Sequence, residues 1–108
     1  MKTNAVNFTG FIQYTSPKNQ IAATLDTKNI LGIQQKKENG KLCKDETKIL
    51  IKNTHDNNKK YPYAVISVTN LPINYVIMEY NKACNNEFAD LGRVIEIEYL
   101  QDRKGFVV

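Results

Sequence analysis

The most informative local signal in the sequence is the dipeptide Asn39-Gly40, which stands between two extended-type segments. Asn-Gly is the strongest short-range signal for a two-residue β-hairpin turn, because both residues tolerate the positive φ angles that this turn requires. We therefore predict that residues 30–38 and 41–44 pair as antiparallel strands. The side chains near the turn are polar on both faces, so the tip of the hairpin should project into water.

Several other segments have the residue pattern of β-strands. Apolar and polar residues alternate with a period of two, as in strands with one buried face, in residues 6–15, 21–25, 47–53 and 93–100. Residues 61–69 are almost continuously apolar or β-branched, which predicts a central strand with Pro62 at its start. Gly10 predicts a bend or bulge in the first strand, and residues 106–108 are expected to form a short last strand.

One helix is predicted over residues 72–86. Its apolar residues recur at helical spacing and form a single stripe, which consists of Ile73, Val76, Ile77, Tyr80 and Cys84. Pro72 suits the first turn and Asn70 suits the cap. Ile73 and Val76 are β-branched, so a strand over residues 73–80 is the competing interpretation.

These elements predict one domain, residues 1–108, of the α+β class, mostly antiparallel with one helix at about 72–86. The order of elements is compatible with a small OB-like barrel; the alternative is a generic antiparallel sheet with one packed helix. The predicted core consists of Ile49, Ile51, Val65, Ile66, Val68, Val76, Ile77, Tyr80, Ile95, Ile97 and Tyr99.

Positive charge is concentrated in the middle third of the chain. The net charge of the 108 residues is +4, yet residues 28–60 alone hold nine lysines against four acidic residues, while residues 61–108 have an excess of two acidic residues. Lysines hold phosphates as point charges. The alternative is that lysine, asparagine and isoleucine reflect an AT-rich genome, such as that of a low-GC bacterium, its phages or its plasmids.

Aromatic residues on strands accompany the lysines. Phe11 lies on the opposite strand face from Phe8 and Tyr14, so part of this set must face away from the core. Exposed rings beside lysines are typical of proteins that stack single-stranded bases and bind phosphates. We predict a binding module for single-stranded DNA or RNA with little sequence preference, which uses Lys28, Lys36, Lys37, Lys41, Lys48, Lys52, Phe11 and Tyr63.

The alternative function is that of a small accessory or inhibitor protein, of the kind that phages and plasmids encode. Such a protein acts by binding another protein, through surface loops or an open sheet edge. Salt-dependent retention on single-stranded DNA would separate the two hypotheses.

An enzyme of ordinary mechanism is not expected. The only histidine, His55, lies in the polar segment 53–60, which we interpret as a mobile surface loop. Glu96 and Glu98 share a strand face, which we interpret as a solvated surface. The sequence has no glycine-rich phosphate-binding motif. We therefore predict no catalytic site, no metal site and no cofactor.

Cys43 and Cys84 are expected to be free thiols, because two cysteines without metal-site spacing make neither a disulfide framework nor a metal site. No apolar run approaches the roughly 18 residues typical of a membrane span. The first residues also lack the apolar stretch of a signal peptide. The sequence thus favours a cytoplasmic protein without a membrane partner.

Overall fold

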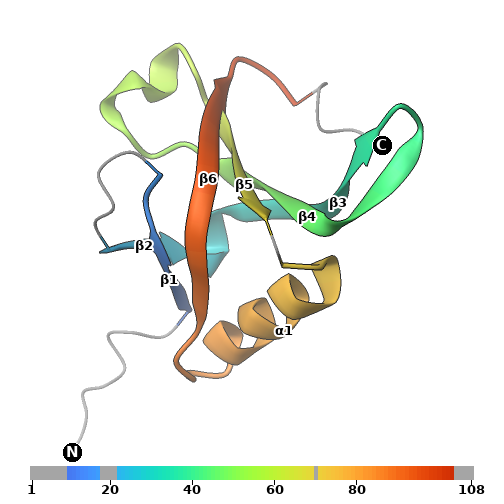
Figure 1. The fold of residues 1–108 in the computed structure, drawn as a ribbon. Helices are drawn as coiled ribbons and strands as arrows, with labels where there is room; N and C mark the ends of the chain where they lie inside the picture. The colour runs from blue at the N-terminus through green and yellow to red at the C-terminus, as the bar shows by residue number, and fades with distance from the viewer. Residues whose placement is uncertain (1–9, 18–21, 70, 104–108) are drawn as a thin grey trace, which may run out of the picture.

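The structure is a computed structural model that describes residues 10–17, 22–69 and 71–103. Six strands and one α-helix form in this part of the chain (Figure 1). In chain order the elements are β1 (Phe11–Thr15), β2 (Ala22–Asp26), η2 (Thr27–Asn29), β3 (Ile30–Glu38), β4 (Lys41–Lys52), η3 (Asp56–Lys59), β5 (Tyr63–Thr69), α1 (Ile73–Cys84) and β6 (Asp90–Leu100), where η marks a short 3-10 helix.

The strands form one sheet in the order β2-β1-β6-β5-β4-β3. All neighbours are antiparallel except β1 and β6, which are parallel. The prediction of a mostly antiparallel α+β fold is confirmed, and so is the central position of the 61–69 strand, since β5 lies between β4 and β6. Within the described residues β2 and β3 remain unpaired edges. The fold therefore fits the generic antiparallel sheet and does not confirm the OB-like barrel.

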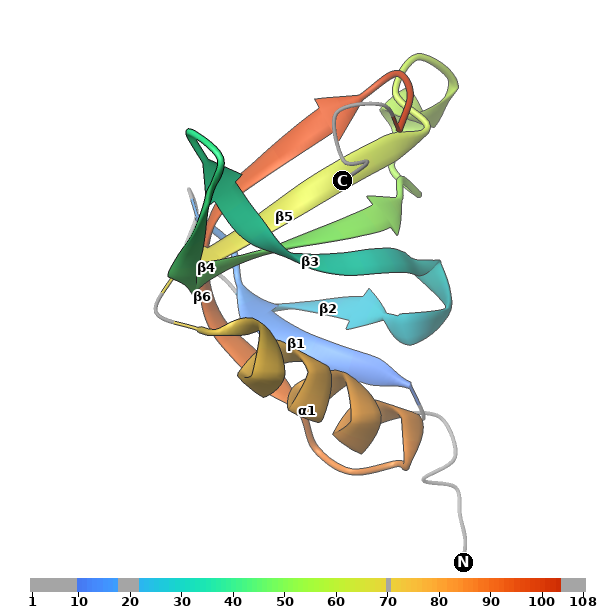
Figure 2. The same ribbon diagram turned by 90° about the vertical axis from the view of Figure 1, so that its right-hand side faces the viewer.

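The sheet curves around α1, which lies at one end of it (Figure 2). Apolar side chains from the concave face and from α1 fill the space between them. The buried cluster consists of Ile12, Leu25, Ile49, Ile66, Val68, Val76, Ala83, Ala89, Leu91 and Val94. Burial of this apolar surface is the main force that holds the helix against the sheet.

The β3–β4 hairpin forms at the predicted turn, where Asn39 and Gly40 have φ angles of 53° and 82°. The prediction of two separate strands at 41–44 and 47–53 is wrong, because β4 runs without interruption. Gln35 pairs with Thr47, whereas Lys37 pairs with Leu42. The β3–β4 pairing is therefore irregular at residues 43–46. This irregular stretch is where the sequence pattern was interpreted as a break between two strands.

The helix exposes part of its predicted apolar stripe. Its buried residues are Val76, Glu79 and Ala83, while Ile77 is 40% exposed and Cys84 is also exposed. Glu79 can face the core because Oε1 accepts a hydrogen bond from the Asp90 N–H at 2.9 Å and Oε2 accepts one from Lys82 Nζ at 3.0 Å. Because its carboxylate is hydrogen-bonded, Glu79 can be buried. The face of α1 that meets the core is therefore turned away from the apolar stripe predicted from the sequence. The predicted cap, Asn70, lies outside the described residues; Pro72 occupies the N-cap.

A β-bulge in β6 changes which residues face the core. Val68 pairs with Val94 and Ser67 pairs with Glu96, so Ile95 is the extra residue of the bulge. Val94 is buried and Ile95 is 44% exposed. The predicted inward position of Ile95 is therefore wrong, because the extra residue shifts the alternation by one.

The predicted core is correct in its centre and wrong at its margins. Five of its members are buried, namely Ile49, Val65, Ile66, Val68 and Val76. Three pack against the core while partly buried, namely Ile51, Tyr80 and Ile97. Three are exposed, namely Ile77, Ile95 and Tyr99.

Gly10 lies immediately before β1 and has a φ of +81°. A Cβ at this position would lie 2.8 Å from Thr27 Oγ1. The Gly10 N–H donates to Ala83 O, and Gly10 O accepts from the Thr27 N–H. The predicted bend or bulge within a 6–15 strand is not tested, because residues 6–9 lie outside the described ranges. The positive φ of Gly10 lets the chain pass close to both α1 and η2. Parts of three predicted strands lie outside the described residues. These parts are residues 6–9 of the 6–15 strand, residue 21 of the 21–25 strand, and the whole 106–108 strand.

Both cysteines are free, as predicted. In the part of the chain that the structure describes, no helix has the length and apolar character to cross a membrane.

Candidate functional site

At the end of the sheet opposite α1, β4 ends, β5 begins and β6 ends (Figure 1). Aromatic residues of these segments contact one another there. The Tyr99 ring lies 6.2 Å from His55 in an edge-to-face arrangement and 6.3 Å from Tyr61, measured between centroids. Tyr99 remains 37% exposed. Tyr63 begins β5 at the same end of the sheet, but it pairs with Leu100 and therefore points to the opposite face from Tyr99, which pairs with Ala64. These four residues at one end of the sheet, on its two faces, are called the aromatic end: His55, Tyr61, Tyr63 and Tyr99.

Cations accompany these rings. Lys60 Nζ lies 5.3 Å from the centroid of the Tyr61 ring, and Arg103 Cζ lies 5.9 Å from that of Tyr63. Lys52, the last residue of β4, is the cross-strand partner of Tyr63. Both ring contacts fall within the distance of a cation–π interaction, which keeps the cation beside a half-buried ring.

Asn53 fixes the loop that carries part of this site. Its Nδ2 donates to Asn57 Oδ1 and to Tyr61 O, both at 2.7 Å, and its Oδ1 accepts from the His55 N–H at 3.0 Å. Asn53 is only 3% exposed, whereas residues 54–60 are exposed. The predicted polar surface loop is therefore tied to the sheet by one buried amide.

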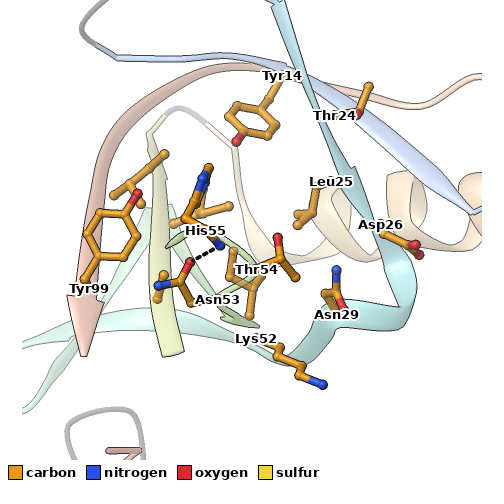
Figure 3. A pocket seen from close by; sticks show the side chains of 14 residues that line it. Tyr14, Thr24, Leu25, Asp26, Asn29, Lys52, Asn53, Thr54, His55 and Tyr99 are labelled. Carbon is orange, nitrogen blue, oxygen red and sulfur yellow. Dashed lines mark hydrogen bonds between the residues drawn. The ribbon is translucent and has the colours of Figure 1, made fainter. Parts of the chain in front are cut away.

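A pocket of about 70 Å³ lies beside the aromatic end, between β2 and the 52–55 segment (Figure 3). Its floor is apolar and includes Ile51, Ala64, Ile66 and Ile97. In Figure 3 the hydroxyl of Tyr14 points into this space, and the side chains of Lys52 and Asp26 point away from it. Burial, and then the nearby Tyr99, raise the pKa of Tyr14, so its hydroxyl stays protonated at neutral pH.

The strand register arranges charge on the outer face of β4, β5 and β6, the face turned away from the core. One row of partners is Lys48, Ser67 and Glu96, and another is Lys52, Tyr63 and Leu100. The basic side of this face therefore lies on β4 and the acidic side on β6.

The structure brings together three of the predicted site residues. Lys48 and Lys52 share one face of β4, with Tyr63 directly across from Lys52. Lys28 and Lys36 are instead engaged in ion pairs, with Asp26 at 3.8 Å and with Glu46 at 3.0 Å. The hydrogen bond from Lys36 to Glu46, reinforced by the charge of that carboxylate, raises the pKa of Lys36. Lys37 and Lys41 lie exposed near the hairpin turn.

Phe11 lies in a different place from the other predicted site residues. It lines a depression of about 280 Å³ together with Gln13, Thr24, Asn86, Glu87, Phe88 and Ala89. Phe88 is 71% exposed there. β6 separates β1 from β5 in the sheet, so the Phe11 and Tyr63 rings belong to separate surfaces.

Six residues of this site were absent from the predicted binding residues: Asn53, His55, Lys60, Tyr61, Tyr99 and Arg103. They come from the 53–62 segment and from the end of β6 and meet only through the β5–β6 pairing. The signal that could have found them is the aromatic pair at the start of the 61–69 strand, which follows a lysine-rich loop.

Among the described residues, no group of three or more histidine, cysteine, aspartate or glutamate side chains could hold a metal ion. Comparisons with protein-family models, curated proteins and solved structures find no match to this chain.

Proposed function

We propose that the protein binds single-stranded DNA or RNA at the aromatic end, with phosphates held by lysines of β4 and of the neighbouring loop. The observation that carries the proposal is the pairing of half-buried rings with cations, Tyr61 with Lys60 and Tyr63 with Arg103. Single-strand-binding surfaces combine these two features, because bases stack on rings while the backbone follows a positive groove.

The charge distribution supports a path along β4. Lys48 and Lys52 project from the same face, and Lys59 and Lys60 follow on the loop beyond β4. Glu96 and Glu98 on β6 would repel a phosphate backbone. A strand on this surface would therefore keep to the β4 side and reach the ring of Tyr63, the cross-strand partner of Lys52. It would have to pass around the end of the sheet to reach Tyr61, whose ring contacts Tyr99 on the other face.

A pair of charge-matched variants tests this location. K52Q/K60Q removes two cations from the aromatic end, and K37Q/K41Q removes two from the hairpin tip. We expect K52Q/K60Q to weaken binding of a single-stranded oligonucleotide and to flatten its salt dependence, by up to about 0.7 in slope for each phosphate that is no longer neutralised. K37Q/K41Q should have the smaller effect. A greater loss of binding in K37Q/K41Q than in K52Q/K60Q would place the binding site on the hairpin.

Binding of another protein is the second candidate function, and one observation favours it. Phe88 is 71% exposed beside Phe11 in the 280 Å³ depression, and exposed aromatic side chains are enriched at protein interfaces. The edge of β2 is less suited to this role, because the 52–55 segment lies across the small pocket from it. F88S separates the two functions: it should leave single-strand binding unchanged, whereas a docking function would lose its anchor.

A further inference from the structure

We propose that copies of this chain associate head to tail, with Leu42 of one copy seated in the depression that Phe11 and Phe88 line on the next copy. Leu42 lies near the tip of the β3–β4 hairpin. Neither surface belongs to the aromatic end, so this contact goes beyond the function proposed above. A second copy is the partner because the hairpin and the depression complement each other in apolar character, size and charge.

The two surfaces carry the two most exposed large apolar side chains of the described residues. Phe88 is 71% exposed at the depression, and Leu42 is 58% exposed on the hairpin. Lys37 is the direct cross-strand partner of Leu42, and Lys41 precedes it in β4. The hairpin therefore presents an apolar side chain beside exposed cations.

The depression is large enough for the Leu42 side chain. Its volume is about 280 Å³, whereas a cavity of about 150 Å³ is sufficient for a benzene ring. A leucine side chain is smaller than that ring, so the apolar stems of neighbouring lysines also fit against the rim. Phe11, Phe88 and Ala89 give the depression an apolar lining against which a leucine can pack.

The charges at the two surfaces are opposite in sign. Glu87 is the one charged residue among those that line the depression, and Asp90 is the cross-strand partner of Gln13 in the same lining. Lys37 and Lys41 would meet these carboxylates in a head-to-tail contact. A two-fold contact between like surfaces would instead bring Glu87 against Glu87 or the hairpin lysines against each other, which is unfavourable.

The positions of the two surfaces allow the contact to repeat. The β3–β4 hairpin and the connection from α1 to β6, which carries Phe88, lie at opposite ends of the molecule (Figures 1 and 2). A copy whose hairpin is engaged therefore keeps its own depression open, and an open row of molecules results. The contact is small, so association requires a high protein concentration. Under the function proposed above, neighbours on one long single strand would touch in this way and bind it cooperatively.

Sedimentation velocity of the protein alone, up to millimolar concentration, tests the contact. The average mass of the wild type should rise with concentration, and added salt should reduce this rise because it screens the lysine–carboxylate attraction. L42S removes the side chain that inserts and F88S removes a wall of the depression, so each variant alone should stay monomeric. An equimolar mixture of the two should form a dimer and nothing larger, because F88S supplies an intact hairpin and L42S an intact depression.

I95S is the matched control, since Ile95 is also an exposed apolar residue but lies in neither surface. It should associate as the wild type does. A wild-type protein that stays monomeric at every concentration would overturn the proposal, and so would a mixture of L42S and F88S that forms no dimer. Association of L42S alone would overturn it in favour of a two-fold contact through the depression. These measurements contain no nucleic acid, so their failure would leave the proposed function standing.

Discussion

The end of the sheet covered by α1 and the aromatic end both bury polar side chains, but they differ in what surrounds those groups. At the covered end, Glu79 is 3% exposed and Thr47 is fully buried, donating its Oγ1 proton to Leu71 O at 2.7 Å. Apolar side chains of the core lie around them. At the aromatic end, Asn53 is equally buried and bonded, yet exposed rings and cations surround it.

This difference suggests that the two ends of the sheet serve different purposes, stability at the covered end and binding at the aromatic end. Satisfied buried polar groups fix the geometry of the chain at both ends, because leaving any of them unpaired would carry a desolvation cost. The aromatic end places half-buried rings beside cations. The covered end also exposes rings, Tyr75 on α1 and Phe88 after it. Substitutions at the covered end should therefore change the free energy of unfolding. Substitutions of rings and cations at the aromatic end should change binding, and substitution of Asn53 should change both.

The largest change in the free energy of unfolding is expected from I49A. Ile49 is fully buried in the core cluster, so truncation should lower the free energy of unfolding by about 2–5 kcal/mol. Urea denaturation measures this change. I95A is the control, because Ile95 is largely exposed at the bulge and its truncation should change stability by less than about 0.5 kcal/mol. Equal losses in both variants would mean that Ile95 faces the core after all.

E79A should be the next largest change. It removes the acceptor of the Asp90 N–H and of Lys82 Nζ, and an unpaired buried donor costs about 1–3 kcal/mol. E79Q keeps one carbonyl oxygen for the Asp90 N–H and should lose less. If E79A were as stable as the wild type, Glu79 would not be the reason for the orientation of α1.

N53A should lower stability and binding together. Loss of the amide frees the loop from Tyr61 O and Asn57 Oδ1, at a cost of about 1–3 kcal/mol in unfolding free energy. The Tyr61 ring would then be held less firmly for stacking. A variant that loses stability but binds single strands as tightly as the wild type would exclude the loop from the binding site.

Y63A should change the affinity for single-stranded nucleic acid. If a base stacks on the ring, affinity for single strands should fall by about 1–3 kcal/mol with the salt dependence unchanged. Anisotropy titrations at several salt concentrations measure both quantities. F11A serves as the comparison, because Phe11 lies in the separate depression with Phe88 and should leave binding unaltered. A larger loss in F11A than in Y63A would move the stacking surface to that depression.

The smallest effect is expected from I77A. Ile77 lies beside the buried Val76 in sequence but on the exposed side of α1, so its truncation should change stability by less than about 0.5 kcal/mol. V76A provides the contrast and should cost clearly more. The pair decides which face of the helix meets the sheet.

The sequence predicted the fold correctly where neighbouring residues determine the conformation of the chain. Asn39-Gly40 forms its turn, Pro62 precedes β5, and the helix occupies nearly its predicted range. Errors arose where a partner far along the chain decides the outcome. The buried Glu79 carboxylate accepts a hydrogen bond from the Asp90 backbone N–H, 11 residues away, and the Ile95 bulge is defined by the pairing of β6 with β5.

The candidate site was predicted only in part for the same reason. Lys48 and Lys52 follow from alternation along a single strand, and Tyr63 was identified as a strand aromatic. The pairing of Tyr61 with Tyr99, and of Tyr63 with Arg103, depends on two strands meeting across the sheet. Lys28 and Lys36 were selected by charge alone. The hairpin brings Glu46 to Lys36, whereas Asp26, the partner of Lys28, lies only two residues away in the sequence.

The central claim is that the aromatic end binds single-stranded nucleic acid, and the salt dependence of binding by the wild-type protein tests it most directly. The logarithm of the association constant for a single-stranded oligonucleotide should fall linearly with the logarithm of the salt concentration, by about 0.7 for each phosphate that is neutralised. Three or four lysine–phosphate pairs would give a slope of roughly −2 to −3. Absence of binding at low salt, or binding whose strength does not change with salt, would contradict the account.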